Sequence, residues 1–242
     1  MSHERYQIMD SVRRTLETSR AAAEKGGRTE LHALARLWLS EGIPFAFRAI
    51  PGLYEIVREW IATRLSIHPK ELTLIGSGRQ GSSIAPPPKT GKPFDDESDL
   101  DWSVVSQPLF VRFKEEFETW AKDYRNGIVQ PRQRIERQYW DENLSTCPRT
   151  LQRGFIDPHK VPTWDRYPLS QLTGNTMWLV GGKCRSTVQA PVFKKSTIRV
   201  YEDWNAFIKQ LAINLDYSCK ALAREGLSDQ QRTRESWGRY QK

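Results

Sequence analysis

Two acidic residues, Asp99 and Asp101, are separated by the single apolar residue Leu100 and begin an alternating run that continues to Val105. Alternation of this kind predicts a half-buried β-strand, so both carboxylates point to one face while Leu100 points into the core. Two carboxylates that lie close together repel each other unless a cation lies between them. Mg²⁺ is the cation we expect, because it prefers oxygen ligands and leaves coordination positions for water and phosphate.

A third acidic residue, Asp157, follows the short apolar run Phe155–Ile156. We expect this run to be a strand that neighbours the strand of the acid pair, which would place three carboxylates around two metal ions. In such a site one ion lowers the pKa of an attacking hydroxyl while the other holds a triphosphate. A simpler interpretation also exists, because surface strands often carry two acids and Asp157 is an ordinary turn residue before Pro158.

A phosphate-binding corner is predicted where the β-prone run 72–75 ends at Gly76 and Ser77. Glycine lets the backbone approach a phosphate closely, and successive N–H groups with a serine hydroxyl can surround it. Arg79 would add positive charge to this corner. A glycine–serine turn alone is weak evidence, but the corner and the three acids, each beside a β-prone run, form a specific combination.

The elements that must position these residues are helices and short strands, so we expect an α/β (α+β) protein with a small mixed β-sheet. Apolar residues at helical spacing predict helices over 4–24, from Thr29 onward, and over 54–65, 110–124 and 198–222. Further strands are predicted within 172–193, around Gly181 and Gly182, whereas 81–97 holds three prolines and should be irregular. The expected division is N-terminal helices (1–68), a central catalytic unit (69–195), a C-terminal helix (196–227) and a polar tail (228–242).

The composition indicates which partners and which cellular compartment to expect. Lys and Arg number 37 against 29 Asp and Glu, a net charge of +8 that favours polyanionic partners such as nucleic acid or nucleotides. A cationic surface without such a partner is the plainer interpretation. No apolar run is long enough to span a membrane and the first residues do not resemble a signal sequence, so we expect a cytoplasmic protein. The three cysteines are far apart, which predicts free thiols.

The combined pattern resembles the DNA polymerase β-like nucleotidyltransferases. The resemblance is carried by Leu72–Ser77 with Gly81, by Ser98–Val105 and by Phe155–Asp157. It implies a mixed palm, flanked by the N-terminal helices and by a C-terminal helical part. It also implies two Mg²⁺ ions, with Mn²⁺ as a substitute, and transfer of a nucleoside monophosphate from a triphosphate to a hydroxyl with release of pyrophosphate.

The same resemblance assigns roles to individual residues. It makes Asp99, Asp101 and Asp157 the catalytic metal ligands, and it places Gly76, Ser77, Arg79 and Ser98 around the nucleotide. A basic residue that reaches the triphosphate is expected near the next element, and the candidates are Arg199, Lys194 and Lys195. The stretch between Ser77 and Asp99 is longer than in minimal members of the superfamily, and the extra residues form a plain surface loop, a mobile lid or a contact to the acceptor.

Within the superfamily the chain looks most like the Hailong-type nucleotidyltransferases of bacterial anti-phage defence. That resemblance implies dATP as substrate and a single-stranded DNA oligomer as product. It implies Tyr240 in the polar tail as the catalytic first hydroxyl, and a membrane effector as a partner reached through the product, without membrane insertion of this chain.

Other acceptors stay open. The product is a cyclic oligonucleotide if the acceptor is another nucleotide, as in CBASS-type synthases. The protein is a toxin if the acceptor is tRNA or another protein. A member of a different class would be a binding module that has lost catalysis, although retention of all three acids argues against it.

Overall fold

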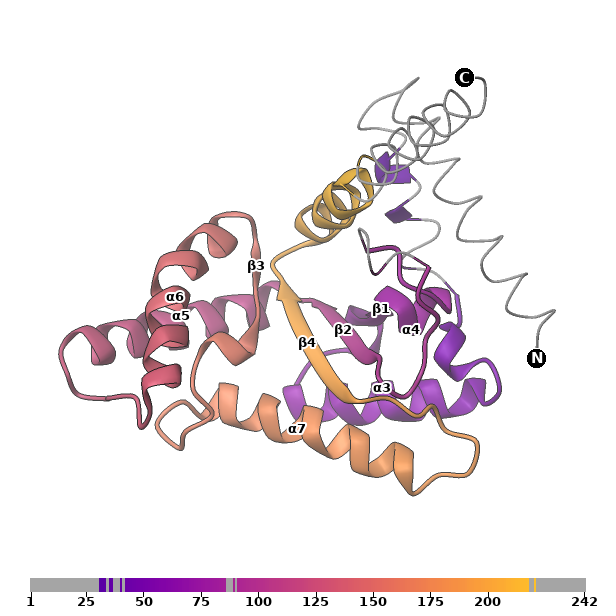
Figure 1. Ribbon diagram of the computed structural model, residues 1–242, viewed down its shortest axis with the longest axis horizontal. Helices are drawn as coiled ribbons and strands as arrows, with labels where there is room; N and C mark the ends of the chain where they lie inside the picture. Colours follow the sequence, from indigo (N-terminus) through magenta and orange to yellow (C-terminus); the bar gives the residue numbers. More distant parts are fainter. Residues whose placement is uncertain are drawn as a thin grey trace, which may run out of the picture.

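Four strands of the described chain form one mixed sheet, in the order β1-β2-β4-β3 (Figure 1). The strands are β1 (Leu72–Ile75), β2 (Asp99–Val105), β3 (Phe155–Ile156) and β4 (Lys195–Tyr201). β1 pairs antiparallel with β2, β2 parallel with β4, and β3 antiparallel with β4. This computed structural model describes residues 31–33, 35–36, 40, 42–85, 89, 91–217 and 220. It confirms the expected mixed α/β class and the predicted strands at 72–75, 100–105 and 155–156.

The helices of the described chain surround this sheet. They are the helical residues 31–33 and 35–36, then α3 (Pro51–Leu65), α4 (Gly76–Gln80), α5 (Gln107–Arg125), α6 (Arg134–Gln152) and α7 (Pro168–Arg185), followed by helical residues 204–217. Short 3₁₀ turns lie at Phe45–Phe47 (η1), Pro69–Glu71 (η2) and Pro158–Lys160 (η3). Among the described residues, no helix combines the length and the apolar character that a membrane span requires.

The main hydrophobic core lies between one face of the sheet and helices α3, α5 and α7. Leu100, Trp102 and Val104 of β2 all point into it, since they alternate along the strand, and all three are almost fully buried. Tyr54 of α3 stacks on Trp102 with ring centroids 5.9 Å apart. Alternate side chains of β2 therefore pack in this core, and the side chains between them face away from it.

A smaller hydrophobic cluster covers part of the opposite face. Val105, Phe155 and Tyr201 pack there against Phe207 and Leu211 of the 204–217 helix. This helix lies across the sheet from α3 and α7 (Figure 1). It covers the end of the face where β2 and β4 finish, so the end where β2 begins, with its acid pair, stays outside this cluster.

Two predicted elements are wrong. The 172–193 region forms most of helix α7 rather than strands, because Met177, Val180 and Cys184 recur at helical spacing and are buried. The 198–222 helix begins later, because 195–201 is strand β4, in which Ile198 and Val200 alternate inward. Residues 125–150, which the sequence left unassigned, contain helix α6. The predicted helix over 4–24 and the tail over 228–242 lie outside the described residues.

Candidate active site

Asp99 and Asp101 line one cavity of about 480 Å³ together with Gly76, Ser77 and Ser98. Both acids stand on the sheet face opposite the main core, since Leu100 between them is fully buried in that core. β1 reaches the same place from the other direction, because Ile75 is the register partner of Asp101 and the chain turns at Gly76. The structure therefore brings together five of the site residues that the sequence predicted.

Gly76 is required at this corner for two separate reasons. Its φ is +67°, a backbone conformation that residues with a side chain rarely adopt. In addition, a Cβ atom at Gly76 would lie 3.1 Å from Oδ2 of Asp101. Only glycine lets the backbone turn this close to the carboxylate, and the turn leads directly into Ser77 and the short helix α4.

The neighbouring strand β4 positions the acid pair. The Thr197 hydroxyl donates a hydrogen bond of 2.6 Å to Oδ1 of Asp101, and the two residues are register partners. Burial raises the pKa of Asp101, the bond from Thr197 opposes this, and the nearby charge of Asp99 raises the pKa further. Nζ of Lys195 lies 3.6 Å from Oδ2 of Asp99. The Asp101 carboxylate thus lies in a place where negative charge is unfavourable and a cation is attracted.

Ser98 is fixed by the loop that leads into β2. Its hydroxyl donates to Oδ1 of Asp95 at 2.8 Å and accepts from the backbone N–H of Asp95 at 3.0 Å. Its carbonyl oxygen accepts from the backbone N–H of Lys194 at 2.8 Å. Ser98 consequently holds the start of β2 against the start of β4, and it lines the cavity beside the acids.

Cationic and aromatic side chains complete the cavity wall. Lys89 and Lys92 lie in the segment between the corner and the acids, and Tyr217 comes from the 204–217 helix. Lys92 also lies 3.6 Å from Asp95 in an exposed ion pair. The cavity thus offers carboxylates for a metal ion and ammonium groups for phosphates. Thr197 and Tyr217 were not predicted as site residues, although alternation over 195–201 was a signal that could have placed Thr197.

Arg79 is buried beneath the corner rather than in the cavity. Its guanidinium donates to the carbonyl oxygen of Leu74, to the Thr73 hydroxyl at 2.8 Å and to the carbonyl oxygen of Gly42 at 3.3 Å. The residue is 5% exposed and does not line the cavity. The expectation that Arg79 adds charge at a phosphate is therefore corrected: its charge is used to hold β1 to the segment before η1.

Asp157 does not lie on a strand next to the acid pair, because β4 lies between β2 and β3. That expectation is wrong, and the physical reason is a late strand inserted at the centre of the sheet. Asp157 instead accepts two hydrogen bonds from Arg199, at 2.6 and 3.1 Å. Neither residue lines the cavity of the acid pair. Their predicted roles, as a third metal ligand and as a contact to the triphosphate, stay predictions.

The described chain contains no group of three or more His, Cys, Asp or Glu side chains that could hold a metal ion. The carboxylates that line the cavity are those of Asp99, Asp101 and Glu97, and Glu97 forms an ion pair of 3.0 Å with Lys194. Lys195, the alternative to Arg199 in the sequence, is the cation that approaches this pair. Tyr240, predicted as the first acceptor hydroxyl, lies outside the described residues.

Comparison of the chain with models of protein families, with curated proteins and with solved structures found no match.

Proposed function

We propose that this protein is a metal-dependent nucleotidyltransferase, which moves a nucleoside monophosphate from a triphosphate to a hydroxyl. The observation that carries the proposal is the approach of Gly76 to Asp101, which puts a glycine–serine corner and two carboxylates on one cavity wall. The palm architecture that the sequence resembles is part of the proposal. The acid pair on an inner strand, with the corner at the end of its antiparallel neighbour, supports it.

The residues present fit a divalent cation. Asp99 and Asp101 supply oxygen ligands, and partial burial raises the pKa of Asp101, so a bound cation would stabilise its ionised form. When bound there, Mg²⁺ would supply positive charge to the triphosphate and lower the pKa of the attacking hydroxyl. Lys89 and Lys92 would meet the phosphates that the metal does not neutralise.

The proposed reaction is a displacement at the α-phosphorus. The oxygen of the acceptor hydroxyl forms a bond to that phosphorus, and the bond from the phosphorus to the bridging oxygen of the β-phosphate breaks. Pyrophosphate leaves with the electron pair, and the hydroxyl proton passes to water. The chain contributes by orientation: Ser77 and the backbone after Gly76 hold the phosphates, while Thr197 holds the Asp101 carboxylate in place.

The test is incubation of the purified protein with each labelled ribonucleotide and deoxyribonucleotide triphosphate and Mg²⁺, followed by a denaturing gel. We expect incorporation of label and release of pyrophosphate, and loss of both in Asp99→Asn and Asp101→Asn. Glu118→Gln, which changes an exposed acid of α5, is the matched control and should act like the native protein. Full activity in either aspartate variant, or no product with any nucleotide, would overturn the proposal.

The product separates the finer proposals from one another. A DNA ladder made from dATP that stays attached to the native protein would support self-primed oligomer synthesis of the Hailong type. In that case the Tyr240→Phe variant should form no product that is attached to the protein. A phosphatase-resistant cyclic product would support a CBASS-type synthase instead. Label that appears only on added tRNA or on a second protein would support a toxin.

A further inference from the structure

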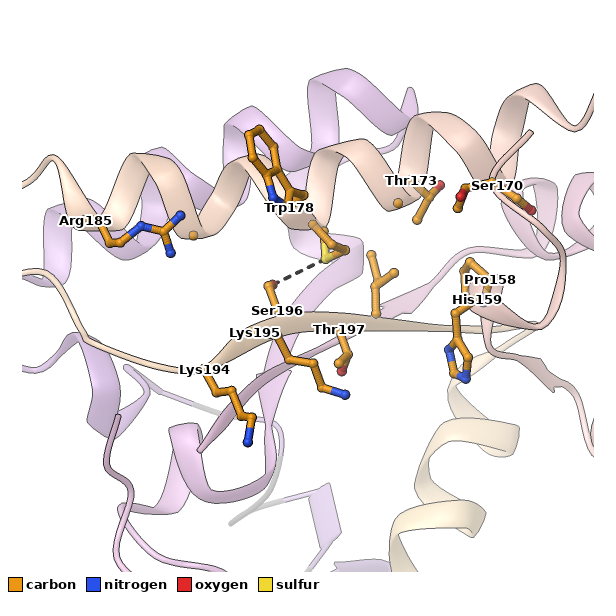
Figure 2. Close-up of a pocket in the computed structure, with 15 residues that line it drawn as sticks. Pro158, His159, Ser170, Thr173, Trp178, Arg185, Lys194, Lys195, Ser196 and Thr197 are labelled. Carbon is orange, nitrogen blue, oxygen red and sulfur yellow. Dashed lines mark hydrogen bonds between the residues drawn. The ribbon is translucent and has the colours of Figure 1, made fainter. Parts of the chain in front are cut away.

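A second cavity, of about 520 Å³, lies between helix α7 and the beginning of strand β4 (Figure 2). It exists because β3 pairs only with Val200 and Tyr201. Among the described residues, no strand pairs with the earlier part of β4 on that side. The cavity of the acid pair and this second cavity have no lining residue in common.

The wall of α7 is hollowed by small residues at helical spacing. Ser170, Gly174 and Gly181 all line the cavity. A Cβ atom at Gly174 would lie 2.7 Å from Cγ2 of Thr163, and one at Gly181 would lie 3.2 Å from the Arg185 guanidinium. Glycine inside a helix costs about 1 kcal/mol relative to alanine. The helix thus gives up stability at positions where a side chain would collide with Thr163 or displace Arg185.

One buried polar atom on the α7 side of the cavity has no hydrogen-bond partner among the described residues. Ser170 is 1% exposed, and its Oγ has no hydrogen-bond partner among the described residues. Buried hydroxyls are nearly always hydrogen-bonded in native proteins, because an unsatisfied one costs about 1–3 kcal/mol.

The charged and aromatic side chains of the cavity indicate the class of ligand that fits it. Arg185, Lys194 and Lys195 line it, whereas no Asp or Glu does. Trp178 is 73% exposed at the rim, an unusual position for the largest apolar side chain. An aromatic ring beside a positive groove is the combination that binds single-stranded nucleic acid, with a base stacked on the ring and phosphates on the cations.

The lysines connect this cavity to the acid pair. Figure 2 shows Arg185 on the α7 side, and Lys194 and Lys195 extending from β4 away from that helix. Lys194 lies 3.0 Å from Glu97, and Lys195 lies 3.6 Å from Asp99. A strand that crosses the edge of β4 would therefore pass from Trp178 over the lysines to the carboxylates.

We propose that the cavity between α7 and β4 binds the acceptor as a single-stranded oligonucleotide, with a base on Trp178 and phosphates on Arg185 and Lys194. The end of that strand then lies at Asp99 and Asp101. This inference rests on the proposed nucleotidyl transfer for the role of the strand, but the binding itself needs neither metal nor turnover.

The test is fluorescence anisotropy of labelled ten-nucleotide single strands, DNA and RNA, in the presence of EDTA. We expect Trp178→Ala to weaken binding about tenfold or more, since base stacking contributes about 1–3 kcal/mol. Tyr139→Ala, which removes an aromatic side chain that is 58% exposed on α6, is the matched control and should leave binding unchanged. Arg185→Glu should weaken binding and make it less dependent on salt concentration. Arg185→Gln should lower the slope of the logarithm of the binding constant against the logarithm of the salt concentration, by the amount that corresponds to about one phosphate contact.

The outcomes distinguish this inference from the proposed function. Equal binding by the native protein, Trp178→Ala and Tyr139→Ala overturns the inference, as does failure of the native protein to bind either strand. Transfer to an added oligonucleotide that does not depend on Trp178 overturns the inference while the proposed function stands. Binding that depends on Trp178, without transfer of any nucleotide, supports a nucleic-acid site and overturns the proposed function together with the acceptor role.

Discussion

Arg199 holds Asp157 by two hydrogen bonds, of 2.6 and 3.1 Å, at the place where β3 ends beside β4. Both side chains are largely buried, with the carboxylate 15% and the guanidinium 32% exposed. Arg199 also lies over the ring of Phe155, 4.8 Å from its centroid. This ion pair links the end of the short strand β3 to strand β4. Either side chain could bind a ligand fully only if the ion pair opened.

Asp157→Asn should therefore destabilise the protein, because Arg199 keeps its charge and loses its partner. We expect the free energy of unfolding to fall by about 1–3 kcal/mol, measured by urea denaturation. The loss in the free energy of unfolding in the Asp157→Asn/Arg199→Gln double variant should be smaller than the sum of the losses in the two single variants. If Asp157→Asn is as stable as the native protein, Asp157 is kept for a bound ligand and not for Arg199.

Asp101→Asn should behave in the opposite way. Burial and the neighbouring Asp99 raise the pKa of Asp101, so its ionised form opposes folding at neutral pH. The asparagine variant should lose about 10²–10³-fold or more in nucleotide transfer while its free energy of unfolding stays equal or rises. Urea denaturation beside the transfer assay measures both. Loss of activity together with loss of stability would mean that Asp101 is needed for the fold.

Arg79→Met should destabilise the corner at Gly76 and Ser77 without a specific effect on nucleotide binding. The change leaves the Leu74 and Gly42 carbonyl oxygens and the Thr73 hydroxyl without this donor. We expect a loss of about 2–4 kcal/mol in the free energy of unfolding. Arg112→Met, an exposed change on α5, is the control. A stable Arg79→Met protein with weakened triphosphate binding would restore the phosphate role.

The buried Asp123 predicts a pH dependence of stability. It accepts from Arg166 at 2.6 and 3.1 Å and from the Tyr167 hydroxyl at 3.0 Å. The bond from Arg166 lowers the pKa of Asp123 below its ordinary 3.8, whereas burial and Asp123 raise the pKa of Tyr167 to about 12. Both groups therefore contribute fully between about pH 4 and 10. The Asp123 contribution is lost as pH falls below 3.8, and the Tyr167 contribution as pH rises from 10 to 12.

Asp123→Asn tests this window. At pH 7 the variant should be less stable than the native protein by about 1–3 kcal/mol, because Arg166 and Tyr167 lose the carboxylate. The difference should be nearly unchanged at pH 4 and should shrink when urea denaturation is repeated at pH 3. A difference that stays constant down to pH 3 would show that the ionised carboxylate contributes no stability.

The sequence predicted the local parts of the site well and its long-range parts poorly. The alternation from Asp99 to Val105 and the turn at Gly76 depend on neighbouring residues, so strand β2 and the corner were predictable. Which strand lies next to β2 depends on pairing between residues about a hundred positions apart, as with Asp101 and Thr197. For that reason Thr197 was missed and Asp157 was placed one strand too near.

Helix α7 was not predicted from the sequence, because glycines that line the neighbouring cavity lie within it. Gly181 and Gly182 are poor helix formers, and together with the β-branched residues nearby they favoured strands. Packing of Met177, Val180 and Cys184 into the core outweighs that preference. The residues that misled the sequence interpretation include those that form the cavity beside β4.

In the described part of the chain, the beginning of β4 has no strand partner on the side of β3, and this has a consequence for how copies of this chain meet one another. A strand edge with free backbone groups can pair with the edge of another molecule, and natural proteins often block this with lysine. Lys194 and Lys195 stand at the beginning of that edge, so their mutual repulsion between two molecules opposes edge-to-edge association. Replacing both by serine should produce aggregates that grow with protein concentration, detectable by light scattering, even if the fold of each molecule is intact.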